Sequence, residues 1–426
     1  MFKEDNEYED RQLTEKTSGE INLSPDASSG IGVPILGIDL GSRQIRVVAG
    51  FVDENSRLEI AGLRETESNG ITNGFIDDQD VLVEAIRETL GELSIFLSKE
   101  IKEAYISVPG NHLKRFTFGS GFVRRDSGKS ITQDELDGYI KQTIEQIELT
   151  AGDQLVHFYP QKFMIDGKGS FTNPMGLKGK EIETELQIVT GAIANMRSII
   201  NCLNKAGLSV AGLIPSYMAM ADAALSDEEK QEGVSLLDIG SSSTQIVIYK
   251  DGCLRYSNVI PFGSAIITED IKNGLLINRK EAEVLKIKSG SALSNKVKEN
   301  EISTVRLNGE PKETSVKNLA RIIQARIEEI LDMVMLEIKN SGLEKDLLKG
   351  MVLCGGGAQL KNLDHLVRRC TGFEVRIGYP VQKLAGGIDM EFRNPAYSTC
   401  IGLLLKGYKI LKSGISVEAE NRELIK

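Results

Sequence analysis

Apolar residues near the start of the chain alternate with small and polar ones and stop at a glycine. The segment from Ile35 to Val52, ILGIDLGSRQIRVVAGFV, predicts a buried strand, a tight turn at Gly41 and a second strand. Apolar spacings of three and four in residues 78–98 predict a helix with Asp78 as its N-cap, and the strand AYISVP follows. Hairpin, helix and strand together indicate one α/β unit.

The opening pattern occurs a second time. Residues 234–250, VSLLDIGSSSTQIVIYK, again predict a strand, an acid, a Gly-Ser turn and a strand, and a predicted helix at 196–206 precedes them. Self-similarity of this kind indicates two related halves.

Residues 111–190 have a different pattern. They predict a strand pair around FTFGSGFV, a helix opened by Thr132 with Glu135 completing a capping box, and the strands VHFYPQKFMIDG and EIETELQIVTG. We interpret this region as a small α+β subdomain inserted into the first half.

The second half is mostly helical between Asn278 and Asn340, interrupted by the polar, β-like segment VRLNGEPKETSV. One apolar face marks a long helix there, formed by Leu319, Ile322, Ile323, Ile327, Ile330, Leu331 and Val334. The segment MVLCGGGAQL predicts a buried strand that ends in three glycines, followed by a helix over 361–370. A last helix, from Pro395 to Tyr408, is expected to close the first domain.

The repeated hairpin carries the candidate chemistry. Each copy places one carboxylate, Asp39 in the first and Asp238 in the second, beside a glycine turn. The N–H groups and hydroxyls of such a turn can surround phosphate oxygens. Carboxylates repel phosphate, so we expect both acids to hold Mg²⁺ through water ligands. A single Asp-x-Gly hairpin is weak evidence for a site, because this sequence is common in turns. Two such hairpins within the same strand-turn-strand pattern favour a clamp for a triphosphate.

Two further features fit such a site. Gly355–Gly357 would let a flat ligand such as adenine approach the backbone, although a tight strand-to-helix turn is an equal alternative. Glu283 and Lys286 lie one helical turn apart and could reach ribose hydroxyls, with a solvated ion pair as the alternative. The GxxxxGK[ST], GxGxxG, HExxH and GxSxG motifs are absent.

Composition narrows the function classes. With 426 residues, 41% hydrophobic, the chain predicts more than one domain, and a net charge of −10 without Trp argues against a nucleic-acid partner. Its five cysteines form no CxxC pair and its three histidines have no metal-ligand spacing, so we expect a reducing cytoplasm and no histidine metal site. Residues 1–30 carry eight acids against three bases and predict a disordered tail, and no apolar run approaches a membrane span.

The motif order DLGS, LLDIGSSSTQIVIY and LCGGGA resembles the phosphate-1, phosphate-2 and adenosine motifs of actin, DnaK-type chaperones and sugar kinases. Within that superfamily the chain resembles the bacterial FtsA family over residues 35–408. The stretches that carry this resemblance are ILGIDLGSRQIRVV, VHFYPQKFMIDGKGSFTNPMGLKG, YSNVIPFGSAIITEDI, VRIGYPVQKLAGG and YSTCIGLLL.

The resemblance implies an α/β, actin-like (ribonuclease H-like) fold of two domains around a nucleotide cleft, with an FtsA-type 1C (SHS2) insertion. We expect the acidic tail at 1–30, subdomain 1A at 31–110 with 395–412, subdomain 1C at 111–190, subdomain 2A at 191–263 with 335–394, subdomain 2B at 264–334 and a linker at 413–426.

The resemblance also implies ATP and Mg²⁺ as cofactors, with both acids as metal residues. The implied nucleotide-binding residues are Asp39, Gly41, Ser42, Arg43, Asp238, Gly240, Ser241, Ser242, Ser243, Thr244, Gly263, Glu283, Lys286, Gly355, Gly356, Gly357 and Ala358. The phosphate-2 motif reads GSSST where many relatives have GGGT. The connecting segment GLIPSYMAMADAAL has no Gln or Glu to position an attacking water, so we expect slow ATP hydrolysis at most.

As partners the resemblance implies further copies of the chain in filaments, later division proteins, and the C-terminal peptide of FtsZ. The protein would link the FtsZ ring to the cytoplasmic face of the inner membrane at the division site. For the FtsZ peptide we expect a basic surface in subdomain 2B: Arg279, Lys280, Lys317 and Arg321.

The family ends in a membrane-bound amphipathic helix, but residues 408–426 form no single apolar face and contain no Trp or Phe. We therefore expect the anchor to follow the given chain or to come from a partner, and favour the former. Three alternatives stay open: a PilM-like pilus-assembly adaptor, an actin-fold small-molecule kinase, and an actin-fold protein whose site has decayed.

Overall fold

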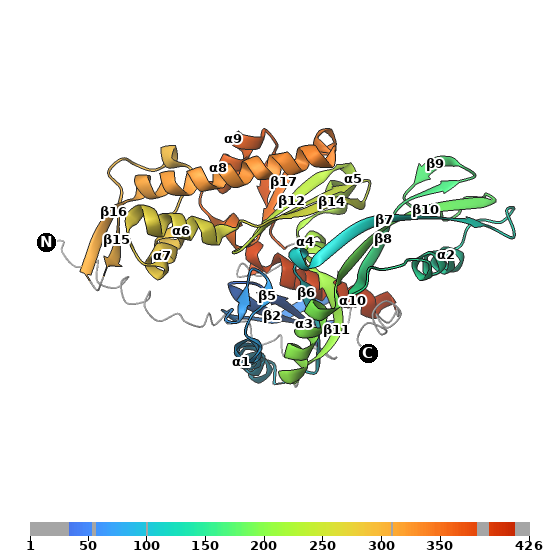
Figure 1. Cartoon of the computed structure of the whole chain (residues 1–426), viewed down its shortest axis with the longest axis horizontal. Helices are drawn as coiled ribbons and strands as arrows, with labels where there is room; N and C mark the ends of the chain where they lie inside the picture. Colours follow the sequence, from blue (N-terminus) through green and yellow to red (C-terminus); the bar gives the residue numbers. More distant parts are fainter. Residues whose placement is uncertain (1–33, 53–56, 99–100, 308–309, 381–391, 414–426) are drawn as a thin grey trace.

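Two five-stranded sheets with the same topology form the two halves of the molecule (Figure 1). The computed structural model describes residues 34–52, 57–98, 101–307, 310–380 and 392–413. The domain 1 sheet has the order β11 (Ser209–Pro215), β6 (Glu103–Val108), β1 (Ile35–Leu40), β2 (Gln44–Val52) and β3 (Leu58–Glu67). The domain 2 sheet has the order β18 (Val375–Ile377), β17 (Met351–Cys354), β12 (Val234–Ile239), β13 (Thr244–Lys250) and β14 (Cys253–Ile260).

The two sheets pair their strands in the same way. The first strand of each half, β1 or β12, is antiparallel to the next strand on one side and parallel to β6 or β17 on the other. The predicted duplication of the hairpin is therefore confirmed, together with the two-domain α/β architecture.

Helices cover both faces of the domain 1 sheet. On one face α1 (Gln79–Leu97) and α3 (Ile193–Lys205) pack against the even-numbered side chains of β1, such as Ile38. On the other face α4 (Ser216–Ala224) and α10 (Ser398–Ser413) pack around Ile35 and Val48. The carboxyl oxygen of Asp78 accepts hydrogen bonds from the first N–H groups of α1, as the sequence predicts. A short hairpin, β4 (Ile71–Thr72) and β5 (Phe75–Ile76), precedes α1.

The helical half surrounds one apolar core. The predicted face of α8 (Val316–Ser341) is buried apart from Ile322, which is half-buried against the same core. The other elements of this half are α5 (Asp227–Glu232), α6 (Ser264–Leu275), α7 (Arg279–Ser289), α9 (Leu363–Thr371), β15 (Ile302–Leu307), β16 (Glu310–Ser315) and the 3-10 turns η3 (Ser294–Lys296), η4 (Glu344–Asp346) and η5 (Gly356–Gln359).

The insertion is a four-stranded sheet that extends to one side of both halves (Figure 1). It follows the 3-10 turn η2 (Gly110–His112), and α2 (Gln133–Glu145) packs on it. The strand order is β7 (Leu113–Val123), β10 (Glu181–Ala192), β8 (Asp153–Ile165) and β9 (Lys168–Phe171).

Two expectations for the insertion are wrong. The segment FTFGSGFV is part of a single strand, because Gly119 and Gly121 stay in register with β10 instead of turning the chain. The capping box of α2 is only half formed. Thr132 accepts the N–H of Glu135, but the Glu135 carboxylate binds Arg124, a buried cation that needs an ionic partner.

The last helix is longer than predicted. The 3-10 turn η7 (Pro395–Tyr397) leads into α10, which ends at Ser413, five residues after Tyr408. Its packing on β1 and α4 confirms that it closes domain 1. No helix within the described ranges is long and apolar enough to cross a bilayer. The predictions for residues 1–30 and 414–426 lie outside the described residues.

Close helix packing makes one glycine of α10 sensitive to substitution. A Cβ at Gly402 would lie 1.8 Å from the Ala219 carbonyl oxygen in α4. We predict that Gly402→Ala lowers the free energy of unfolding by about 1–3 kcal/mol through overpacking. The control is Gly91→Ala in α1, where a Cβ meets nothing within 4 Å, and which should raise it by about 0.5–1 kcal/mol. Equal effects of both substitutions in urea unfolding would contradict the packing argument.

Candidate functional site

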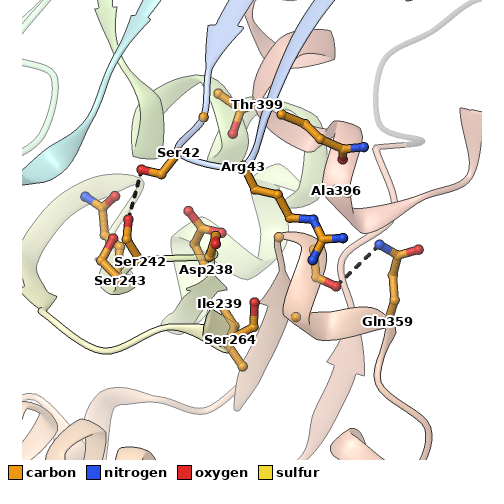
Figure 2. A pocket seen from close by; sticks show the side chains of 18 of the residues that line it. Ser42, Arg43, Asp238, Ile239, Ser242, Ser243, Ser264, Gln359, Ala396 and Thr399 are labelled. Atoms are coloured by element: carbon orange, nitrogen blue, oxygen red, sulfur yellow. Dashed lines mark hydrogen bonds between the residues drawn. The ribbon is translucent and has the colours of Figure 1, made fainter. Parts of the chain in front are cut away.

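A cleft of about 520 Å³ lies between the two repeated hairpins (Figure 2). Asp39 near the end of β1 and Asp238 near the end of β12 face this cleft from opposite halves of the molecule. The turn after β1, Gly41–Arg43, forms one wall and the turn after β12, Gly240–Ser243, forms the facing wall. The duplicated sequence pattern therefore meets at one site.

A hydroxyl pair joins the two turns directly. Ser242 Oγ donates a hydrogen bond of 2.9 Å to Ser42 Oγ, as Figure 2 shows. Behind the second turn, the N–H of Ser264 at the start of α6 donates to the Gly240 carbonyl at 2.8 Å. A Cβ at Gly263 would lie 2.5 Å from the Ser241 carbonyl oxygen, so this position needs glycine. Backbone N–H groups and hydroxyls around an open space are suited to binding an anion.

The triple glycine forms the third wall and is shaped by close packing. Gly355 has a φ of +82°, and a Cβ there would lie 2.2 Å from Asp238 Oδ1. A Cβ at Gly357 would lie 2.4 Å from the Ile239 side chain, whereas Gly356 has open space beside it. Two of the glycines therefore bring this turn against β12, and the third leaves room for a flat group in the cleft.

The two acids carry an electrostatic penalty. Asp39 accepts a hydrogen bond of 2.7 Å from Ser107, and burial raises its pKa. Burial and repulsion by Asp39 raise the pKa of Asp238 to about 7, although Arg46 nearby acts in the opposite direction. Two buried, repelling carboxylates beside an anion-binding surface fit a hydrated Mg²⁺ ion, which typically keeps several waters and one or two carboxylates. No larger metal-binding cluster occurs among the described residues.

Helix α7 forms the fourth wall. Lys286 is buried and donates hydrogen bonds to the Ser264 carbonyl (2.9 Å) and to Thr268 Oγ1 (2.8 Å), and its ammonium lies 2.7 Å from the Glu283 carboxylate. Burial, followed by repulsion from Arg43 and Arg279, lowers the pKa of Lys286 to about 7. Glu283 also pairs with Arg43 across the cleft. The pair is therefore not the solvated ion pair considered as an alternative.

Most of the sequence-predicted residues line the cleft together. They are Asp39, Gly41, Ser42, Arg43, Asp238, Gly240, Ser241, Ser242, Ser243, Glu283, Lys286, Gly355, Gly356 and Gly357. Thr244, Gly263 and Ala358 lie behind the lining. The Thr244 hydroxyl is used inside the fold, where it donates to the Phe262 carbonyl at 2.7 Å.

Several lining residues were not predicted. They include Arg46, Asn73, Gly74, Asn111, Gln245 and Ser264. A signal existed for two of them, because the register pairs Asp39 with Arg46 and Asp238 with Gln245, each seven residues after its acid. The others come from the β4–β5 turn, from η2 and from the start of α6, which no local pattern links to the hairpins.

The four basic residues predicted for a peptide partner have different surroundings. Arg279 begins α7 and pairs with Glu269 at 3.1 Å, and its charge acts on Lys286 at the cleft. Lys317 pairs with Glu299, and Arg321 acts on the same carboxylate. Lys280 and Arg321 are exposed. Lys317 and Arg321 thus share one carboxylate, whereas Arg279 belongs to the edge of the cleft.

Sequence comparisons agree with this arrangement. The family model described as "Cell division protein FtsA" matches residues 235–402, and that described as "SHS2 domain inserted in FTSA" matches residues 110–190. The chain is 30% identical to the cell division protein FtsA of Neisseria meningitidis, over 88% of this chain and 90% of that protein. The chain belongs to the FtsA family. It is also 30% identical to the FtsA of Bacillus subtilis, over 86% and 82% of the two chains.

Solved structures show the same fold at lower identity. The chain is similar to a chain of the PilM-PilN type IV pilus biogenesis complex, with a TM-score of 0.61 and 15% identity over 88% of this chain and 99% of that one. It is also similar to MreB5 of Spiroplasma citri bound to ADP, with a TM-score of 0.50 and 15% identity over 91% and 99%. These likenesses confirm the actin-like fold alone. The PilM-like alternative therefore shares the fold, while the sequence belongs to the FtsA family.

The raised pKa of Asp238 predicts a pH dependence of stability without nucleotide. Its folded-state pKa of about 7 exceeds the ordinary value of 3.8, so its contribution is full below pH 3.8 and is lost as the pH rises through 7. We predict that raising the pH from 5.5 to 7.5 destabilises the parent chain more than Asp238→Asn, by about 1–2 kcal/mol in urea unfolding. Parallel pH profiles of the two chains would contradict the raised pKa of Asp238.

Proposed function

We propose that this FtsA-family protein binds ATP with Mg²⁺ in the cleft between the two hairpins. The observation that supports this most strongly is the pair of buried carboxylates, Asp39 and Asp238, each beside a glycine turn. Asp39 and Asp238 would hold Mg²⁺ through water, and Ser42 and Ser242 would contact phosphate oxygens. Bound Mg²⁺ would supply positive charge that neutralises both the carboxylates and the triphosphate.

The triple-glycine turn and α7 would hold the nucleoside. Gly356 leaves open space for the adenine ring, and the carboxylate of Glu283 is an acceptor suited to ribose hydroxyls. Ser216 and Met220 line the cleft from the segment that connects the two halves, which contains no Gln or Glu. We therefore propose slow ATP hydrolysis at most, with the nucleotide acting mainly on assembly.

We further propose that the protein forms filaments, binds the C-terminal peptide of FtsZ and tethers the FtsZ ring to the membrane. Family membership supports this role in cell division. The peptide would contact the basic residues Lys317 and Arg321 on α8, and later division proteins would contact the SHS2 insertion. The protein would then act as a peripheral protein at the cytoplasmic face of the inner membrane at the division site.

The metal assignment predicts a specific loss in Asp238→Ala. ATP affinity of the parent chain should rise when Mg²⁺ is added, whereas the variant should lose this gain and bind Mg-ATP about tenfold or more weakly. Filament formation should weaken in parallel. Asp137→Ala, on the exposed side of α2, is the control and should behave like the parent in calorimetric titration. An Asp238→Ala variant with the parent's Mg-ATP affinity would remove Asp238 from the site.

The peptide assignment is tested by charge reversal on α8. We predict that Lys317→Glu with Arg321→Glu weakens binding of an FtsZ C-terminal peptide by about 1–3 kcal/mol, because an acidic peptide then meets like charges. Lys339→Glu reverses an exposed charge near the other end of the same helix and is the control. Fluorescence anisotropy measures the affinities, and circular dichroism checks the fold. Unchanged affinity of the double variant would exclude these two residues from the peptide site.

A further inference from the structure

The Pro-Gln step in strand β8 of the SHS2 insertion produces an irregularity in the sheet. In the register with β10, Pro160 pairs with Leu186 and Lys162 pairs with Glu185, so Gln161 is an extra residue. Pro160 has no N–H for a sheet hydrogen bond, which favours a bulge at this place. A β-bulge redirects a side chain, and Gln161 is buried with 4% exposure although it lies in the insertion's own strand.

A second bulge lies in strand β14 of domain 2. There Leu254 pairs with Tyr249 and Tyr256 pairs with Ile248, so Arg255 is the extra residue. Strands β8 and β14 contact each other. Two touching strands from different domains therefore each carry a bulged residue at their contact, Gln161 in β8 and Arg255 in β14.

The two bulged residues bind each other's strands. Gln161 Nε2 donates a hydrogen bond of 2.8 Å to the Leu254 carbonyl. Arg255 Nη1 lies 3.2 Å from both the carbonyl oxygen and Oε1 of Gln161 and donates to them. Arg115 of β7 supports the contact, because its guanidinium donates to the Ser257 carbonyl and lies 5.7 Å from the Tyr256 ring centre. We call this set the bulge contact.

The bulge contact is connected through the sheet to the turn after β12, Gly240–Ser243, which we call the second phosphate turn. Strand β14 pairs with β13 up to Thr244, the residue that follows the Gly240–Ser243 turn. The end of β14 leads to Phe262, whose carbonyl accepts the Thr244 hydroxyl, and then to Gly263 against the turn. Displacement of β14 would therefore move the backbone that surrounds the anion site.

The insertion also enters the cleft at its first residues. Gly110 and Asn111, in the turn that leads from β6 into the insertion, line the cleft. A Cβ at Gly110 would lie 2.3 Å from the Gln245 amide of β13, so this turn contacts the second hairpin closely. The insertion thus contacts two neighbouring strands of the domain 2 sheet, β13 and β14, at two separate places.

We propose that Gln161 and Arg255 are positioning residues for the second phosphate turn, so that attachment of the SHS2 insertion to domain 2 and nucleotide binding are coupled. This inference rests on the proposed ATP site. Coupling is reciprocal: a contact that favours the nucleotide-binding arrangement of the turn is itself stabilised by the nucleotide. The insertion therefore responds to the nucleotide state through its docking on β14.

The test uses hydrogen exchange on the full chain with three variants. Gln161→Ala removes the bulged amide, Arg255→Met removes the guanidinium but keeps an apolar stem, and Lys162→Ala is the control. Lys162 is adjacent to Gln161, but it pairs with Glu185 within the insertion. Exchange is followed in the segments 240–250 and 153–165, with and without Mg-ATP, and Mg-ATP affinity is measured in parallel.

Without nucleotide, we expect faster exchange in 240–250 for Gln161→Ala and Arg255→Met, and parent-like exchange for Lys162→Ala. With Mg-ATP, segment 153–165 of the parent should exchange more slowly, and both bulge variants should lose this response and bind Mg-ATP about fivefold or more weakly. If Gln161→Ala does not fold, Arg255→Met and the response of the parent decide the question.

Folded bulge variants with parent-like exchange in 240–250 and parent-like Mg-ATP affinity would overturn the coupling. Unchanged exchange of the parent chain in 240–250 when Mg-ATP is added would instead contradict the proposed function itself. In that case the comparison without nucleotide still supports or overturns the role of the bulge contact in positioning the turn.

Discussion

The burial of two carboxylates in one cleft is the constraint around which the site is arranged. Asp39 and Asp238 come from different halves of the chain, and the pKa of each is raised by burial. Arg46 offsets part of the repulsion, and Ser107 donates a hydrogen bond to Asp39. Folding alone leaves this penalty, whereas a divalent cation between the two halves would remove it. Under the proposed function, this penalty would favour a metal-bound nucleotide over the empty cleft.

Two contacts between the halves also lie at this place. The Ser42–Ser242 hydrogen bond and the Arg43–Glu283 pair both cross the cleft beside the acids. Each connects elements that only the fold brings together, so each depends on how far the halves are closed. The bulge contact adds a link from the SHS2 insertion to strand β14 of domain 2. In this account nucleotide, domain closure and insertion docking are parts of one equilibrium.

Much of this arrangement was predictable from local pattern. Alternating apolar residues that end at an Asp-x-Gly turn specify a hairpin, and two such turns imply two facing acids, as found for Asp39 and Asp238. Other features depend on partners distant in the sequence. A hydroxyl such as that of Thr244 is suited to binding phosphate, but in the fold it donates to the Phe262 carbonyl. The segment FTFGSGFV stays extended because β10 pairs with it. The bulges at Gln161 and Arg255 can be recognised only once the pairing of each strand with its neighbour is known. The proline at 160 was the local signal for the first of them.

The most direct measurement of the central claim is the position of a metal ion in a crystal of the protein grown with a non-hydrolysable ATP analogue and Mn²⁺. Anomalous scattering locates Mn²⁺ independently of the nucleotide, and Mn²⁺ shares the oxygen ligands of Mg²⁺. The account predicts an anomalous peak between Asp39 and Asp238, with the triphosphate between the turns at Ser42 and Ser242. A well-ordered nucleotide in the cleft without a metal near either carboxylate would contradict the account.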